Sequence, residues 1–73
     1  MEGWHKRVDG RTRGRSTDYV VVRVDSTGDI WLDAGYVIAG EDCYTARPVC
    51  FTVDMARNLR AAIDEAIERA SDV

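Results

Sequence analysis

The 73-residue sequence has few of the residues from which catalytic and metal sites are built. It contains one histidine, His5, and two cysteines, Cys43 and Cys50. A catalytic nucleophile needs a base within hydrogen-bond reach and a group to orient that base, and a closed zinc site needs four ligands. Since neither set can be assembled here, we expect a non-catalytic protein without a metal or another cofactor.

Long apolar segments are also missing. No run approaches the ~20 apolar residues that a membrane span requires, and no apolar segment follows the charged N-terminus, as it would in a secretory signal. We therefore expect a cytoplasmic protein that makes no membrane contact. The two cysteines are then reduced and buried. In the alternative, a hairpin folded about Ala46 and Arg47 sets Cys43 opposite Cys50, close enough for a disulfide.

The net charge of −3 is divided unequally along the chain, because residues 1–17 sum to +3 and residues 18–73 sum to −6. The first segment is rich in Arg, Gly, Ser and Thr, which predicts a basic, flexible arm. A short strand around Trp4–Val8 is the alternative. Residues 18–73 are expected to form a single domain. A basic segment on an acidic body can bind a polyanion or fold back on the body.

Two strands are predicted from alternating apolar residues, at 19–25 and 30–34. A three-residue loop, 26–28, joins them as a type I turn followed by a bulge, with its glycine in the left-handed conformation. This register pairs Val24 with Ile30 and places the aliphatic side chains of both strands on one face. A two-residue loop would divide those side chains between the two faces, so we reject it.

A short apolar run within 35–42 predicts a third strand, and residues 49–51 predict a last strand that leads into a helix. Thr52 is the expected N-cap of this helix, and Asp54 in the first turn complements the helix dipole. The helix carries one apolar stripe at three- and four-residue spacing. The stripe consists of Met55, Ala56, Leu59, Ala62, Ile63, Ala66, Ile67 and Ala70.

Together these elements predict an α+β fold, a small antiparallel sheet of three to four strands with one C-terminal helix packed on one face. Ion pairs of Asp54 with Arg57 and of Glu65 with Arg69 are expected on the polar side of the helix. A chain of this length buries only ~60% of the surface that it exposes when unfolded. The small core favours a homodimer, because association stabilises the folded chain.

The other face of the sheet is predicted to be unusually apolar for a surface in contact with water. It carries Tyr19, Val21, Arg23 and Trp31, with Arg23 directly opposite Trp31. Aromatic residues and arginine at the centre of a patch are typical of binding hot spots. We therefore predict that these four residues bind protein, either a second copy of the chain or a host protein.

A second hypothesis places the function in the N-terminal cations. The triplet Arg13-Gly14-Arg15 resembles the core of the AT-hook, a short motif whose two arginines lie in the narrow minor groove of A·T-rich DNA. The resemblance implies contact with nucleic acid, and clustered cations also bind phosphates without sequence preference. The residues of this alternative nucleic-acid site are Lys6, Arg7, Arg11, Arg13 and Arg15.

The junction between the last strand and the helix, Phe51–Ala62, resembles small domains encoded by actinobacteria and their phages. In those domains a strand runs into a Thr-capped helix rich in Ala and Arg. The resemblance implies the fold and an actinobacterial or phage origin, and it supplies no activity. We therefore expect a small accessory protein that acts by protein–protein binding, with nucleic-acid binding as the alternative.

Overall fold

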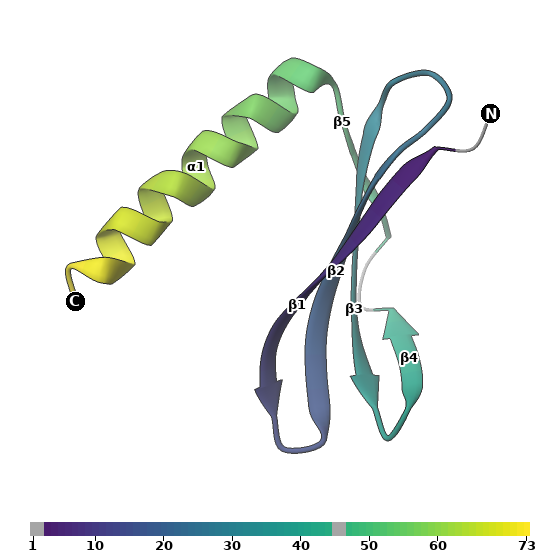
Figure 1. Cartoon of the computed structure of the whole chain (residues 1–73), viewed down its shortest axis with the longest axis vertical. Helices are drawn as coiled ribbons and strands as arrows, with labels where there is room; N and C mark the ends of the chain where they lie inside the picture. Colours follow the sequence, from purple (N-terminus) through teal and green to yellow (C-terminus); the bar gives the residue numbers. More distant parts are fainter. Residues whose placement is uncertain (1–2, 45–46) are drawn as a thin grey trace.

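The computed structural model describes residues 3–44 and 47–73, and it shows an antiparallel sheet followed by one helix (Figure 1). The elements are β1 (Trp4–Arg13), β2 (Ser16–Val24), β3 (Ile30–Ile38), β4 (Glu41–Tyr44), β5 (Val49–Phe51) and α1 (Val53–Ser71). The predicted α+β fold with a single C-terminal helix is confirmed. Within the described ranges, no helix is long and apolar enough to cross a membrane.

The hairpin of β2 and β3 has the predicted register. Val24 pairs with Ile30, and the Asp25 N–H donates to the Asp29 carbonyl oxygen at 3.0 Å. Gly28 has a φ of +87°, the left-handed conformation that closes this three-residue loop. Most aliphatic side chains of the two strands consequently share one face of the sheet, whereas Val21 and Val37 lie on the other. We call the first the inner face, and it includes Trp4, Lys6, Val8, Val20, Val22, Val24, Ile30, Leu32, Ala34, Val49 and Phe51.

The prediction of a flexible arm over residues 1–17 is wrong for the ten residues of β1. This strand pairs along β2 and is interrupted by a bulge between Asp9 and Thr12. A two-residue turn, Gly14–Arg15, joins the strands, with Gly14 at a φ of +61°. The alternative, a strand around Trp4–Val8, is right, and the strand extends further than that alternative. Its full length is not evident from the sequence, because charged side chains lie on both faces and the pairing depends on hydrogen bonds to β2 rather than on alternation. Residues 1–2 lie outside the described residues.

Strand β3 continues through the apolar run that was predicted to form a separate third strand, so that prediction is wrong. Gly35 lies inside the strand, where it is buried and pairs with Tyr19. A Cβ atom at position 35 would lie 2.8 Å from Tyr19 Oη and 2.7 Å from the Cys43 carbonyl oxygen. Because Gly35 has no side chain, it leaves the space into which the Tyr19 ring packs. The glycine does not end the strand.

Strands β4 and β5 lie one after the other along the same edge of β3. Cys43 pairs with Tyr36 in β4, and Cys50 pairs with Trp31 in β5. Tyr36 lies five positions after Trp31 along β3, about 17 Å of strand, so the cysteines cannot form the cross-strand disulfide. Both are free; Cys50 is exposed and Cys43 half-buried, so their predicted burial is wrong. Part of the expected turn, at Ala46, lies outside the described residues.

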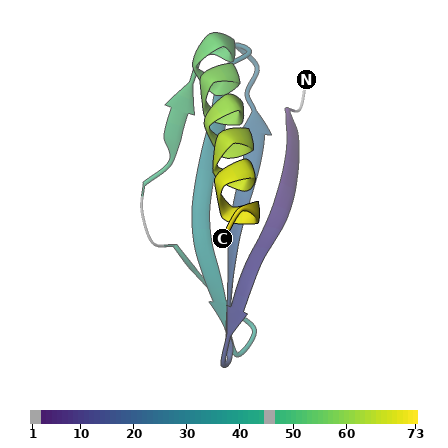
Figure 2. The same ribbon diagram turned by 90° about the vertical axis from the view of Figure 1, so that its left-hand side faces the viewer.

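Helix α1 begins as predicted. The Met55 N–H donates to Thr52 Oγ1 at 3.3 Å, which makes Thr52 the N-cap. The expected ion pairs are formed, with distances of 2.9 Å between Arg57 and Asp54 and 2.9 Å between Arg69 and Glu65. The helix lies over the inner face of the sheet (Figure 2). Its direction relative to the sheet determines the candidate site.

Candidate functional site: an open apolar groove

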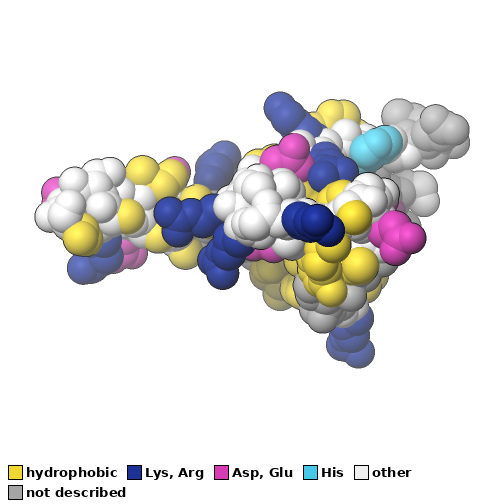
Figure 3. Space-filling model, turned by 90° about the horizontal axis from the view of Figure 1, so that it is seen from below, with side chains coloured by type: hydrophobic (Ala, Val, Ile, Leu, Met, Phe, Trp, Pro, Cys, Tyr) yellow, Lys and Arg dark blue, Asp and Glu magenta, His cyan; other side chains and the backbone are white. Residues whose placement is uncertain are grey.

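Helix α1 is joined to the sheet through β5 and diverges from it toward the C-terminus (Figures 1 and 3). Ala56 and Leu59, in the first two turns, are half-buried. Further along the stripe, Ile63 is 52% exposed and Ile67 is 59% exposed. Burial of the whole stripe was predicted, and this is wrong for a single chain, in which Met55 is also exposed. Only the beginning of the helix packs against the sheet.

The divergence leaves a groove of about 680 Å³ between α1 and the inner face. One wall is the sheet, and the other is the side of the helix that faces it. The apolar lining is formed by Val8, Val20, Val22, Ile30, Leu32, Phe51, Val53, Ala56, Leu59 and Ile63. Three charged residues complete the helical wall, namely Arg57, Arg60 and Asp64. The groove is therefore an apolar surface with charges only on its helical wall.

The chain exposes far more surface than a compact protein of its mass. Its accessible surface is 6114 Å², whereas a compact monomer of 8.2 kDa exposes about 4500 Å². Its radius of gyration is 14.1 Å, against about 11 Å expected for a compact domain of 73 residues. In the part of the chain that the structure describes, Tyr19 is the one buried hydrophobic residue, at 5% exposure. The inner face and the helix stripe thus form a core that a single chain does not close.

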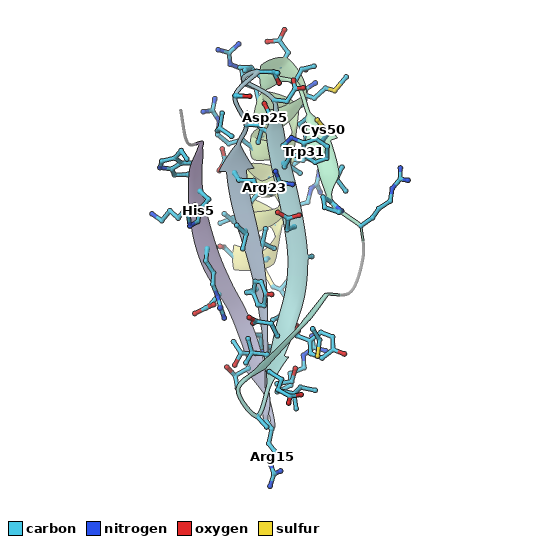
Figure 4. The ribbon with its side chains drawn as sticks, turned by 90° about the vertical axis from the view of Figure 1, so that its right-hand side faces the viewer. His5, Arg15, Arg23, Asp25, Trp31 and Cys50 are labelled. Atoms are coloured by element: carbon cyan, nitrogen blue, oxygen red, sulfur yellow. The ribbon has the colours of Figure 1, made fainter. Side chains whose placement is uncertain are left out.

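The four residues predicted to bind protein share the other side of the sheet, which we call the outer face. Arg23 and Trp31 lie next to each other there (Figure 4). Tyr19 is buried and the other three are half-buried. The Arg7 guanidinium lies 4.2 Å from the centre of the Tyr19 ring, and that of Arg23 lies 5.0 Å from the centre of the Trp31 ring. Arg23 also pairs with Asp33 at 2.9 Å. Cations of the same chain therefore already cover the two aromatic rings.

Asp25 holds the turn at the end of the outer face. Its Oδ1 atom accepts hydrogen bonds from the Thr27 hydroxyl (2.6 Å), the Thr27 N–H (2.9 Å) and the Asp29 N–H (3.1 Å). Its Oδ2 atom accepts from the Trp31 indole N–H at 2.8 Å. These donors, the Thr27 hydroxyl first and the indole second, hold the pKa of the Asp25 carboxyl far below its ordinary value. The turn and the Trp31 ring therefore depend on an ionised carboxylate.

This dependence predicts a loss of stability in acid. Because the folded state lowers the pKa of Asp25, the unfolded chain takes up the proton first as the pH falls below about 4. Stability should be complete above that pH and decline below it. We expect Asp25→Asn to melt at a lower temperature at pH 7 and to show a smaller further decline between pH 5 and pH 2, measured by circular dichroism. Equal pH dependence of wild type and variant would contradict this role, and Glu68→Gln, on the exposed helix surface, is the control.

The predicted nucleic-acid residues do not share one surface. Lys6 pairs with Val22 and lies on the inner face, whereas its neighbour Arg7 lies on the outer face. Arg7 is hydrogen-bonded to Asp9 at 2.7 Å. The triplet with the AT-hook resemblance, 13–15, forms the tip of the β1–β2 hairpin, and Arg15 extends from that tip (Figure 4). The cations are thus distributed over two faces and a turn.

The residues with catalytic potential are scattered as well. His5 is exposed on β1, opposite Arg23. The pKa of the Cys50 thiol is raised, first by desolvation and then by the charges of Asp29 and Asp25, which reduces the nucleophilic thiolate fraction. In the described ranges, no three His, Cys, Asp or Glu side chains are grouped so that they could hold a metal ion.

The fold and its groove define a small α+β chain with an unclosed apolar core. Comparisons with models of known protein families, with curated proteins and with solved structures give no match for this chain. The groove is therefore the feature of this chain that indicates a function. Sequence reasoning identified the stripe and the inner face but predicted that they cover each other. One signal in the sequence could have indicated the open groove. The apolar stripe extends along the whole helix, although the helix is joined to the sheet at only one end.

Proposed function

We propose that this chain is a non-catalytic protein-binding module whose groove takes up an amphipathic helix of its partner. The observation that carries the proposal is the apolar surface left open on both walls, with Ile63 exposed on the helix and Val8 53% exposed on the sheet. Large exposed apolar patches mark sites of protein interaction. Insertion of an amphipathic helix into an apolar groove is a recurrent mode of recognition.

An accessory role in the cytoplasm of an actinobacterium or its phage remains part of this proposal. The outer face remains a second candidate for protein binding. Its side chains are less available to a partner, because they already form an ion pair and cation–π pairs within the chain. Nucleic-acid binding remains the alternative function, and the separation of Lys6 from Arg7 on two faces of β1 disfavours a continuous phosphate-binding surface.

Affinity capture tests which surface binds protein. The immobilised chain is exposed to nuclease-treated actinobacterial lysate, and the retained proteins are quantified by mass spectrometry. We expect Ile63→Glu to lose at least about 90% of the specifically retained protein, a tenfold effect equivalent to about 1.4 kcal/mol, because a carboxylate in the groove must be desolvated when a helix enters. Ala61→Glu introduces the same charge on the opposite side of the helix and should retain the wild-type set.

Two further variants give the contrary outcomes. If Trp31→Glu loses the retained proteins while Ile63→Glu keeps them, the outer face is the binding surface and the groove is not. The other contrary outcome is that proteins are retained only when the nuclease treatment is omitted, and only while Arg13 and Arg15 are present. In that case the alternative function, nucleic-acid binding, replaces the proposal.

A further inference from the structure

We infer that the helix received by the groove is α1 of a second copy of this chain, lying antiparallel to the first α1 about a two-fold axis. This inference rests on the proposed function, because it names the occupant of the same groove. It is carried by three observations: the excess surface of the single chain, the division of charge along α1, and the positions of Arg60 and Asp64.

The excess surface has the size of a dimer interface. The accessible surface exceeds that of a compact monomer by about 1600 Å². Stable obligate dimers bury about 1000–2500 Å² on each subunit. A second copy placed over the groove would therefore bring each chain close to the surface expected for its mass. A short peptide or a small molecule in the groove would leave most of this excess exposed.

The charges of α1 favour the antiparallel direction. The first half of the helix contains Arg57 and Arg60 with one carboxylate, Asp54. The second half contains one cation, Arg69, and the carboxylates Asp64, Glu65 and Glu68. An antiparallel pair places the basic half of each helix beside the acidic half of the other, and it also opposes the two helix dipoles favourably. A parallel pair would bring like charges together along the whole length.

The length of α1 fixes which residues meet. Complete overlap of two antiparallel helices that span Val53–Ser71 puts the two-fold axis at Ala62, the midpoint. Residues equally distant from the midpoint then lie level with each other, so Arg60 of each copy lies level with Asp64 of the other. Both line the groove, and within the described ranges neither has a salt bridge. Each dimer would gain two identical ion pairs at the groove.

The same axis matches large side chains with small ones. Ile67 of one copy comes within about 1.5 Å of axial level with Ala56 of the other, and Leu59 comes equally close to the level of Ala66. An alanine opposite each large residue allows the helices to approach and interdigitate. The exposed Ile67 and the groove-lining Ala56 are thereby placed in one contact.

A charge exchange between two copies tests this arrangement. In the homodimer, Arg60→Glu sets two carboxylates level with the two copies of Asp64, and Asp64→Arg sets two cations level with the two copies of Arg60. We expect each variant alone to dimerise at least about tenfold more weakly than wild type in sedimentation equilibrium at low salt. An equimolar mixture should recover dimerisation as the heterodimer, because both of its facing pairs then consist of opposite charges. One pair then joins two wild-type partners of opposite charge, and the other joins the two substituted residues with reversed polarity. Native mass spectrometry identifies this heterodimer directly.

The matched control is Glu41→Arg, which reverses an exposed carboxylate as Asp64→Arg does, but on β4, outside α1 and the groove. It should dimerise like wild type. Three results would overturn the inference: a monomeric wild type at millimolar concentration, no gain on mixing the two variants, or preferential pairing of Arg60→Glu with wild type, which indicates parallel helices. A monomeric wild type that still captures protein through Ile63 would leave the proposed function standing.

Discussion

Replacing Ile63 with glutamate is expected to convert the proposed dimer to a monomer. Ile63 lies one residue from the proposed two-fold axis, so one substitution places two carboxylates in the centre of the interface. Burying a charge without a partner is unfavourable by several kcal/mol, and a 100-fold weaker dimer corresponds to about 2.7 kcal/mol. We expect at least this weakening in sedimentation equilibrium. The wild-type melting temperature should also rise with chain concentration, and that of the variant should not.

Controls separate association from folding. Ala61→Glu adds the same charge on the opposite side of α1 and should leave the dimer intact. Because Ile63 is 52% exposed in the single chain, the variant should keep the far-UV circular dichroism of the sheet and helix in dilute solution. A loss of this signal at every concentration would mean that Ile63 belongs to a core closed within one chain. A monomeric Trp31→Glu would place the interface on the outer face.

Truncation of Tyr19 should produce the largest loss of stability within the single chain. Tyr19 as a whole is 5% exposed, and its ring packs into the space at Gly35 and lies beneath Arg7. Removing a buried aromatic side chain is destabilising by about 3–5 kcal/mol. A domain of this size has a total stability of about 4–11 kcal/mol. Tyr19→Ala should therefore be largely or wholly unfolded in urea titrations that leave the wild type folded.

Tyr19→Phe is the matched control, because it keeps the ring against Gly35 and should lose much less stability than the alanine variant. Gly35→Ala tests the same contact from the opposite side. Its Cβ would meet the Cys43 carbonyl oxygen at 2.7 Å, and backbone cannot move away as easily as a flexible side chain. A tolerated alanine at both positions would show that the Tyr19–Gly35 contact does not support the sheet.

Features that depend only on residues close together in the sequence could be predicted. Only one register of β2 and β3 agrees with the strict alternation in β2, the glycine in the three-residue loop and the aliphatic residues of β3. Val24 pairs with Ile30 as this register predicts. The N-cap was predictable for the same reason, because Thr52 precedes a continuous apolar stripe. In both cases the residues next to each other in the sequence are sufficient to determine the local structure.

Other features depend on contacts that the local sequence does not contain. Strand β1 has charges on both faces, so the sequence offers only its first part, Trp4–Val8, as an alternative, and its full length depends on pairing with β2. The turn at Ala39–Gly40 has φ values of +51° and +84°, yet alanine has no preference for the left-handed region, so no turn is indicated. The groove could not be predicted because periodicity shows which helix residues share a face. It does not show the angle at which the helix leaves the sheet.

The position of β1 leads us to expect a protective role for the N-terminal cations. The strand occupies one edge of the sheet, where backbone donors and acceptors unpaired within the sheet could add strands of other copies without limit and lead to fibrillar aggregates. We expect three cations of β1 that have no salt bridge in the described ranges to repel the same edge of another molecule, namely Lys6, Arg11 and Arg13. The bulge between Asp9 and Thr12 interrupts a flat surface for pairing. Copies of the chain that meet through their apolar grooves, as proposed, would then not go on to associate edge to edge.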